Sequence, residues 1–101
     1  MKNISIFEKA GPFAENKDIA RTIRIEEIMP ALEIGGDIVI DFDHVGAATQ
    51  SFIHALISDV LRRFGSGVLD RIVFKSCNDT VRKIVAIVVD YMQEGQGIRA
   101  D

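Results

Sequence analysis

The amino-acid sequence predicts a small α/β domain, with a mostly parallel sheet of about four strands and helices packed on it. Segments rich in β-branched residues alternate along the chain with segments whose apolar residues recur every three to four positions. The order is strand, helix, strand, helix, strand, helix, which is typical of parallel strands joined by right-handed crossovers. The chain has 101 residues, 48% of them hydrophobic, so we expect one domain over residues 1–101, with an ordered core over about 3–93 and a tail over 94–101.

The charge balance and the cysteine content limit the classes of partner and compartment. The formal net charge is −3, from 12 basic and 15 acidic residues, which gives no electrostatic reason to expect binding to nucleic acid or to an anionic membrane. Cys77 is the only cysteine, so no intrachain disulfide can form. No apolar run approaches the roughly 20 residues that span a bilayer, and the first residues lack the apolar stretch of a signal peptide. We therefore expect a cytoplasmic protein.

The first elements along the chain are a short strand and a capped helix. Asn3–Phe7 largely alternates polar and apolar residues, which predicts a strand at a sheet edge. Gly11-Pro12 predicts a turn, and Asn16 or Asp18 is expected to cap the helix that follows.

Pro30 lies within the helical pattern that begins there. Proline in a helix interior removes a hydrogen bond and clashes with the preceding turn. We therefore expect a kink near residues 24–27, with Pro30 in the first turn of a short second piece that ends at Gly35-Gly36. The face opposite the apolar residues carries a basic stripe that we expect to be solvated, made of Lys17, Arg21 and Arg24.

Asp37–Phe42 is rich in β-branched residues and predicts a central strand covered on both faces. A loop of mostly small residues follows. Thr49 or Gln50 then opens a helix to about Phe64, whose apolar residues form one continuous stripe.

The last part of the chain predicts a strand over Asp70–Lys75 and a final helix capped by residues 78–80. This helix carries more apolar residues than a helix in a small two-layer domain buries. The surplus residues, which indicate a further apolar surface such as a homodimer or partner interface, are Ile87, Val89 and Tyr91.

The candidate binding region follows the central strand. The strand ends at residues 41–43 and delivers the chain to the carboxyl edge of the sheet, where ligands bind in open α/β folds. The next helix begins with Thr49-Gln50-Ser51, and its first amides lack intrahelical partners and carry a partial positive charge. An anion or a phosphorylated hydroxyl is favoured there. The same residues also fit a structural role, with Thr49 as N-cap and Ser51 as an ordinary first-turn residue.

The same helix has a polar face. Three- and four-residue steps place Ser51, His54, Ser58 and Arg62 opposite the core stripe, as a docking face or as solvated surface.

Motifs for catalysis are weak. Asp41, Asp43 and His44 cluster at one turn, but turn formation by aspartate accounts for them without a metal. Cys77 precedes the last helix, where a thiol can become reactive, although a half-buried cysteine is more commonly inert. The chain has no glycine-rich phosphate loop, no Gly-x-Ser-x-Gly elbow and no Cys-x-x-Cys. We expect no enzyme activity, catalytic residue, metal or cofactor.

Residues 38–53 resemble the central strand–loop–helix of STAS domains, the fold shared by anti-sigma-factor antagonists and sulfate transporter tails. From about residue 13 to residue 92 the chain is similar to the bacterial STAS-like domain family of unknown function. The matching segments are Phe13–Arg21, Asp41–Asp43, Thr49–Phe52 and Phe74–Asn78.

In anti-sigma-factor antagonists the turn carries Asp-Ser-Ser-Gly, and a kinase-type anti-sigma factor phosphorylates the second serine. Matching Asp41 to the strand aspartate places Ser51 on that serine, while the neighbouring aspartate and glycine are replaced by Thr49 and Phe52. The resemblance implies a non-enzymatic regulatory module that docks a kinase-type ATPase or anti-sigma factor through residues 43–51 and the following helix. The implied docking residues are Asp43, His44, Gln50, Ser51, His54 and Ser58, with Ser51 and then Thr49 as phosphorylation candidates.

Two other functions fit the sequence. A nucleotide or another anion could bind at the helix start over Thr49–Ser51, which would make the protein a small-ligand sensor. Alternatively, the last helix could form a purely structural homodimer.

Overall fold

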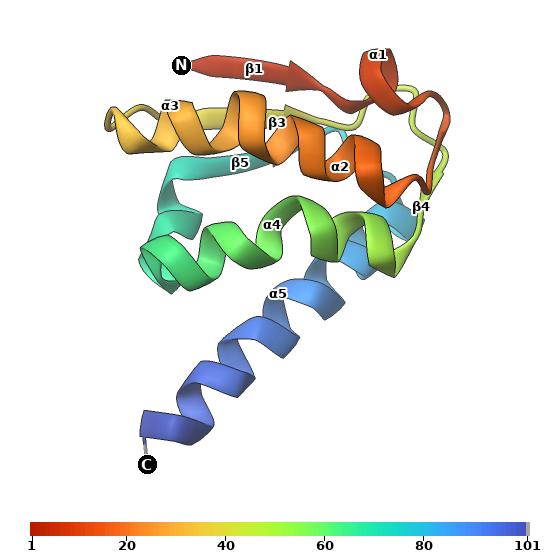
Figure 1. Ribbon diagram of the computed structural model, residues 1–101. Coiled ribbons are helices and arrows are strands. Elements are labelled where there is room, and N and C mark those ends of the chain that lie inside the picture. Colours follow the sequence, from red (N-terminus) through yellow and green to blue (C-terminus); the bar gives the residue numbers. More distant parts are fainter. Residues whose placement is uncertain (101) are drawn as a thin grey trace.

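Three parallel strands form the main sheet, in the spatial order β1–β3–β5 (Figure 1). The computed structural model describes the backbone of residues 1–100 and the side chains of residues 1–93. In it β1 is Lys2–Ser5, β3 is Ile38–Asp41 and β5 is Ile72–Lys75. Val39 lies opposite Asn3 on one side and opposite Val73 on the other. The prediction of a parallel α/β fold is confirmed.

Two further strands form a second, two-stranded parallel sheet. β2 is Phe13–Ala14 and β4 is Ala47–Ala48. Each of them ends one or two residues before a helix start. The sequence predicts about four strands in one sheet, whereas the described residues form five strands, divided between sheets of three and two. The helical segments are α1 (Ile6–Ala10), α2 (Lys17–Ile23), the π-helical η1 (Arg24–Ile28), α3 (Met29–Glu33), α4 (Gln50–Phe64), the 3₁₀-helical η2 (Ser66–Arg71) and α5 (Asp79–Ala100).

The first strand is shorter than the sequence predicts. Ser5 ends β1 and caps α1, because its hydroxyl accepts a hydrogen bond from the amide of Glu8 at 3.2 Å. Phe7 therefore lies in a helix, 39% exposed, and the prediction of a strand over Asn3–Phe7 is wrong for its last two residues. The edge position of β1 is confirmed.

The helix that contains Pro30 is irregular where the sequence predicts it. Residues 24–28 form a π-helical turn, in which the amide of Met29 donates to the carbonyl of Arg24, five residues back. Pro30 then lies in the first turn of α3. The extra residue in the turn accommodates a proline that would otherwise break the hydrogen-bond ladder. Asn16 is the N-cap of α2, and Gly35 follows the helix with a positive φ of 88°.

The helices cover only one face of the main sheet. The strand order β1–β3–β5 never reverses, and successive right-handed crossovers in one direction put the helices of both connections on the same side, where α5 packs against α4. Ile38 and Ile40 are fully buried beneath the helices, whereas Val39 and Asp41 are half-buried and Val73 is 48% exposed. The prediction that the central strand is covered on both faces is therefore wrong.

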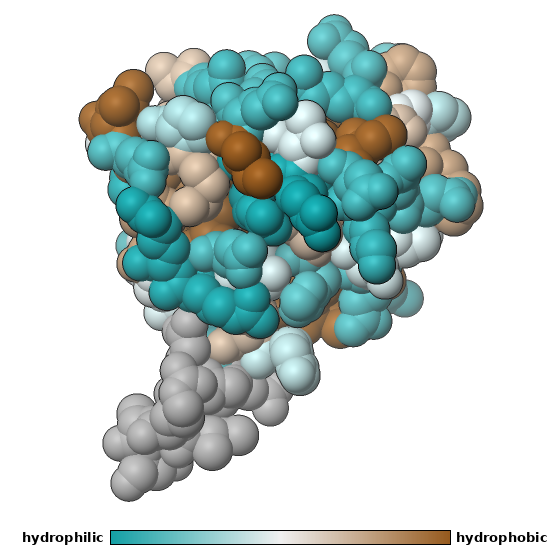
Figure 2. Space-filling view, viewed as in Figure 1, coloured by the Kyte–Doolittle hydropathy of each residue, from teal (hydrophilic) through white to brown (hydrophobic). Residues whose placement is uncertain are grey.

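The core lies between this sheet and three helices, with α4 between α2 and α5 (Figure 1). Phe42 and Phe52 are its largest fully buried side chains. The outer face of α2, α3 and α4 is mainly hydrophilic, with separate hydrophobic patches (Figure 2). Among the described residues, no helix is long and apolar enough to cross a membrane. The prediction of a tail over 94–101 stays a prediction, since the side chains of these residues lie outside the described part of the chain.

Candidate functional site

Thr49 fixes the start of α4. Its hydroxyl accepts a hydrogen bond from the amide of Phe52 at 3.1 Å, which satisfies one of the first free amides of the helix. Its own amide donates to the carbonyl of Ala14 at 2.9 Å. The structural role predicted for Thr49 is therefore confirmed. Its hydroxyl is half-buried and already bonded, which leaves Ser51 as the exposed hydroxyl of this turn.

The starts of α2, α4 and α5 are held together at the carboxyl edge of the sheet. The pairing of β2 with β4 joins the segments that precede α2 and α4. Asn78 joins the third helix to them, because its side-chain amide donates to the carbonyl of Gly46 at 2.9 Å and more weakly to that of Val45. The carbonyl oxygen of the same side chain accepts from the amide of Val81 at 2.8 Å and caps α5. The predicted cap of the last helix is confirmed at Asn78.

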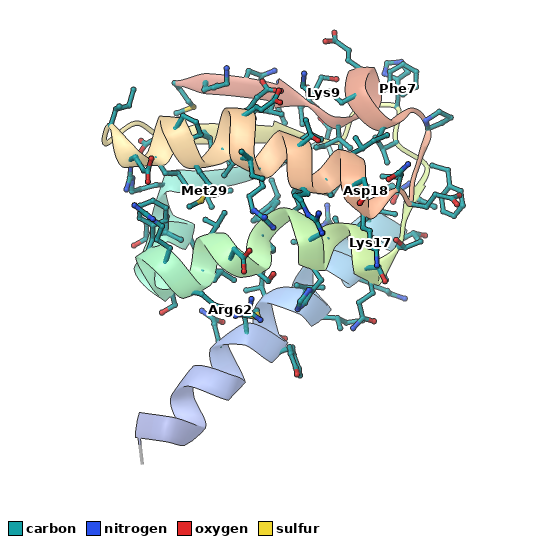
Figure 3. All side chains as sticks on the ribbon, viewed as in Figure 1. Phe7, Lys9, Lys17, Asp18, Met29 and Arg62 are labelled. Atoms are coloured by element: carbon teal, nitrogen blue, oxygen red, sulfur yellow. The ribbon has the colours of Figure 1, made fainter. Side chains whose placement is uncertain are left out.

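An open hollow of about 580 Å³ lies beside the start of α4, between α4 and α5. We call it the α4–α5 hollow. Three residues that the sequence singles out line it together, Gln50, Ser51 and His54. The other lining residues are Lys17, Ala55, Val88 and Tyr91. Figure 3 shows Lys17 reaching from the start of α2 toward α4.

The α4–α5 hollow is suited to a negatively charged group. Among the described residues, the amides of Gln50 and Ser51 donate to no protein group, because they precede the first intrahelical bond of α4. Lys17 adds a full positive charge beside the partial charge of the helix start. The sequence indicated the helix start, but it placed Lys17 on a solvated stripe and Tyr91 among surplus apolar residues.

Asp43 and His44 lie apart from the hollow. His44 has a positive φ of 70°, which turns the chain after β3 toward α1. Its imidazole lies 3.2 Å from the carboxylate of Asp43, and its ring centroid is 5.4 Å from that of Phe7. Figure 3 shows Phe7 on α1 at the upper edge of the molecule, away from Arg62, while Lys17 lies near the start of α4. The predicted docking residues are therefore divided between two surfaces.

Ser58 is buried, with 3% of its surface exposed. The prediction that it continues an exposed polar face with Ser51 and His54 is wrong. The apolar residues of α4 belong to the core, and the helix also contacts α2 and α5, so more of its middle is covered than its apolar stripe alone.

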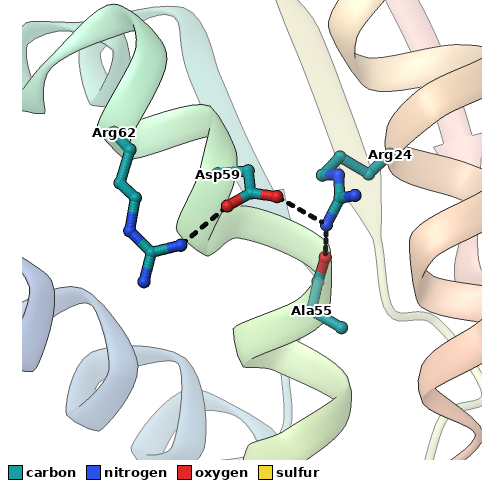
Figure 4. A network of polar contacts seen from close by, with 4 residues as sticks. All are labelled: Arg24, Ala55, Asp59 and Arg62. Carbon is teal, nitrogen blue, oxygen red and sulfur yellow. Dashed lines mark hydrogen bonds and ion pairs between the residues drawn. The ribbon is translucent and has the colours of Figure 1, made fainter.

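Arg24 also departs from the prediction of a solvated basic stripe. Its guanidinium donates to the carbonyl of Ala55 at 2.9 Å and lies 3.2 Å from the carboxylate of Asp59 (Figure 4). Asp59 in turn accepts a hydrogen bond of 2.7 Å from Arg62. Only 15% of the Arg24 side chain is exposed, so it joins the π-helical turn to α4. The stripe retains Lys17 and Arg21 as exposed cations.

Cys77 lies half-buried just before the cap of α5. Burial raises the pKa of its thiol, Arg82 opposes this effect, and Asp41 adds to it. The low pKa that a reactive thiolate would need is therefore absent. Among the described residues, no group of three or more histidine, cysteine, aspartate or glutamate side chains is placed to hold a metal ion.

Comparison with known protein families matches residues 21–82, more than half of the chain, to the STAS-like domain of unknown function. The chain belongs to this family. The match spans the helix before β3, the strand–loop–helix of the candidate site and the start of α5, so the resemblance predicted from the sequence is confirmed. No curated protein and no solved structure matches the STAS-like chain.

Proposed function

We propose that this STAS-like domain is a non-enzymatic regulatory module that docks a protein partner at the α4–α5 hollow and is controlled by phosphorylation of Ser51. The observation that supports the proposal is the position of Ser51. Its side chain is exposed in the first turn of α4, lines the hollow and lies among groups that favour an anion. Gln50 and His54 share the hollow and belong to the docking surface.

A phosphate on Ser51 would make the hollow negatively charged. It adds about −1.5 to −2 charges beside one lysine and two unbonded amides. A partner that presents an acidic side chain to Lys17 would then meet a negatively charged surface. Phosphorylation would therefore weaken docking. Thr49 is a poorer target, because a phosphate there would disrupt the cap bond to Phe52.

The resemblance to anti-sigma-factor antagonists supports a particular kind of partner. The serine matched by Ser51 is the substrate of kinase-type ATPases in related STAS domains. We propose a histidine-kinase-like ATPase or anti-sigma factor as the partner. The α4–α5 hollow is open rather than enclosed and is lined by residues of three helices, as suits the insertion of a side chain from another protein.

The experiment combines phosphorylation with binding. The chain is incubated with Mg-ATP and a histidine-kinase-like ATPase encoded in the same genome, and intact-mass spectrometry records phosphate incorporation. Binding of the ATPase to Ser51→Ala and Ser51→Asp is measured by calorimetry. We expect one phosphate on the unmodified chain and none on Ser51→Ala. Of the two variants, only Ser51→Asp should lose affinity for the ATPase, by about tenfold or more.

Ser66→Asp is the matched control for added charge. Ser66 is exposed and follows the far end of α4, about 20 Å from the hollow at 1.5 Å per residue. This variant should bind the ATPase as the unmodified chain does. Equal affinities for Ser51→Asp and Ser51→Ala, or an equal loss in Ser66→Asp, would contradict the proposed role of Ser51.

The free amides and Lys17 also support a second candidate, a sensor of a nucleotide or another anion at Thr49–Ser51. A ligand at one hundred times its dissociation constant stabilises a protein by about 2.7 kcal/mol. A thermal-shift screen with nucleotides and inorganic phosphate tests this candidate. Stabilisation that Lys17→Ala abolishes would favour the sensor, and the absence of any shift would exclude those ligands.

A further inference from the structure

The outer edge of β5 has backbone groups without a protein partner. The amide of Phe42 donates to the carbonyl of Lys75 at 2.9 Å, so the polar groups of Lys75 point toward β3. Along a strand, the backbone amide and carbonyl groups of successive residues point alternately to the two sides of the strand. The amide and carbonyl of Phe74 therefore point away from β3. In the part of the chain that the structure describes, β5 pairs with β3 alone. The outward amide and carbonyl of Phe74 are available to another strand.

A groove of about 490 Å³ runs beside this edge, between β5 and α5. We call it the β5 groove. Its floor and walls are mainly apolar, formed by Leu69, Ile72, Phe74, Val85, Ala86 and Val89. Arg82 lines one part and Asp90 another, two turns further along α5. At 1.5 Å per residue these opposite charges are about 12 Å apart along the helix, with Ala86 midway between them.

The positions of Arg82 and Asp90 make the β5 groove self-complementary, so that the same surface of two copies can pair. If a second copy is related by a two-fold axis that passes near Ala86, the two α5 helices run antiparallel and Arg82 of each copy faces Asp90 of the partner subunit. The same symmetry pairs the two β5 edges in antiparallel fashion. The amide of each Phe74 then donates to the carbonyl of the partner's Phe74, as in a hydrogen-bonded pair of an antiparallel ladder.

We propose that the β5 groove is the interface of a two-fold symmetric homodimer, in which β5 pairs with β5 of the second copy and α5 of each copy covers the groove of the other. The dimer joins two three-stranded sheets into one of six strands and removes the exposed edge. Because Val88 and Tyr91 point to the other flank of α5, the α4–α5 hollow stays open in both copies. The proposal is therefore independent of the function proposed for Ser51.

Reversal of single charges tests the interface. Sedimentation equilibrium of the full chain should give twice the chain mass of 11.2 kDa. Arg82→Glu places two like-charged pairs across the axis, and so does Asp90→Arg; each should weaken dimerisation by about tenfold or more. An equimolar mixture of the two variants restores both opposite-charge pairs and should form a heterodimer. The double variant should dimerise as the unmodified chain does.

Ile87→Lys is the matched control, since Ile87 is 48% exposed on the flank of α5 away from the β5 groove. It should leave the dimer intact. Hydrogen exchange adds a direct readout, because the amide of Phe74 should exchange more slowly as the protein concentration rises. A monomeric mass at roughly 100 μM, where a dimer with a micromolar dissociation constant would be nearly complete, would overturn the proposal, and so would a dimer broken by Ile87→Lys and not by Arg82→Glu.

Discussion

Replacing Asn78 by aspartate separates the two tasks of this side chain. Its oxygen accepts from the amide of Val81 and caps α5, a task that a carboxylate performs equally well. Its NH₂ group donates to the carbonyls of Gly46 and Val45, a task that a carboxylate cannot perform. Asn78→Asp therefore keeps the cap and removes only the link between α5 and the segment that precedes α4.

The size of the effect follows from these bonds. The hydrogen bond of 2.9 Å to Gly46 contributes about 0.5–1.5 kcal/mol to the free energy of unfolding. The carboxylate would also repel the two carbonyl oxygens that the amide now binds. A negative charge at a helix start regains about 0.3–1 kcal/mol. We expect a net loss of about 1 kcal/mol, which lowers the melting temperature of a domain of this size by about 4–8 °C.

Asn16→Asp is the control. Asn16 caps α2 by accepting from the amides of Asp18 and Ile19 at 2.9 and 3.3 Å, with no carbonyl partner for its NH₂ group among the described residues. This variant should change stability by no more than about 0.5 kcal/mol in either direction. Urea denaturation monitored by circular dichroism measures both variants, with unchanged m values as the sign of a simple stability effect. Equal midpoints for Asn16→Asp and Asn78→Asp would refute the link between α5 and the loop.

Three further predictions test the start of α4, its buried face and the thiol. Thr49→Ala should lower the free energy of unfolding by about 1 kcal/mol through loss of the cap, and Thr49→Ser should be nearly neutral, both by urea denaturation. Ser58→Asp should cost about 3 kcal/mol or more because it buries a charge, while Ser51→Asp on the same helix should be neutral or slightly stabilising. The pKa of the Cys77 thiol is raised in the folded state. The contribution of this shift to the free energy of unfolding is therefore complete below the pKa of the unfolded chain, about 8.5, and is lost as the pH rises through the pKa of the folded chain. The stability of the unmodified chain should therefore fall more steeply than that of Cys77→Ala in alkaline titrations followed by chemical denaturation, and parallel curves would contradict the raised pKa.

Local signals in the sequence were sufficient wherever neighbouring residues decide the structure. Asn16, Thr49 and Asn78 are caps because a short polar side chain can reach amides two or three residues ahead. Pro30 requires a local change in the helix ladder, and the structure supplies a π-helical turn. The sequence did not reveal α1, where Ser5 caps a single turn too short for a helical period to be recognised. It also missed the 3₁₀-helical η2, which takes in Asp70 and Arg71, the first two residues of the strand predicted over Asp70–Lys75.

Predictions that depend on the arrangement of elements were less successful. Periodicity along α4 separates one apolar stripe from one polar face, but it cannot show that α2 and α5 flank the helix and bury Ser58. The same limit applies to Arg24, whose charge indicated solvent and whose guanidinium lies against the carbonyl of Ala55. A run of β-branched residues indicated that β3 is covered on both faces, although helices cover only one.

The order of the strands accounts for both the open sheet face and the place of the candidate site. A doubly wound sheet reverses its strand order, and ligands bind at the reversal, between strands whose helices lie on opposite faces. The order β1–β3–β5 has no reversal, so no such crevice exists between these strands. The helix starts instead gather on one side of the carboxyl edge, where the β2–β4 pair and Asn78 hold them together. The candidate site therefore lies in the hollow between α4 and α5 and not at the strand ends, whereas Asp43 and His44, close to Ser51 in sequence, lie on another surface.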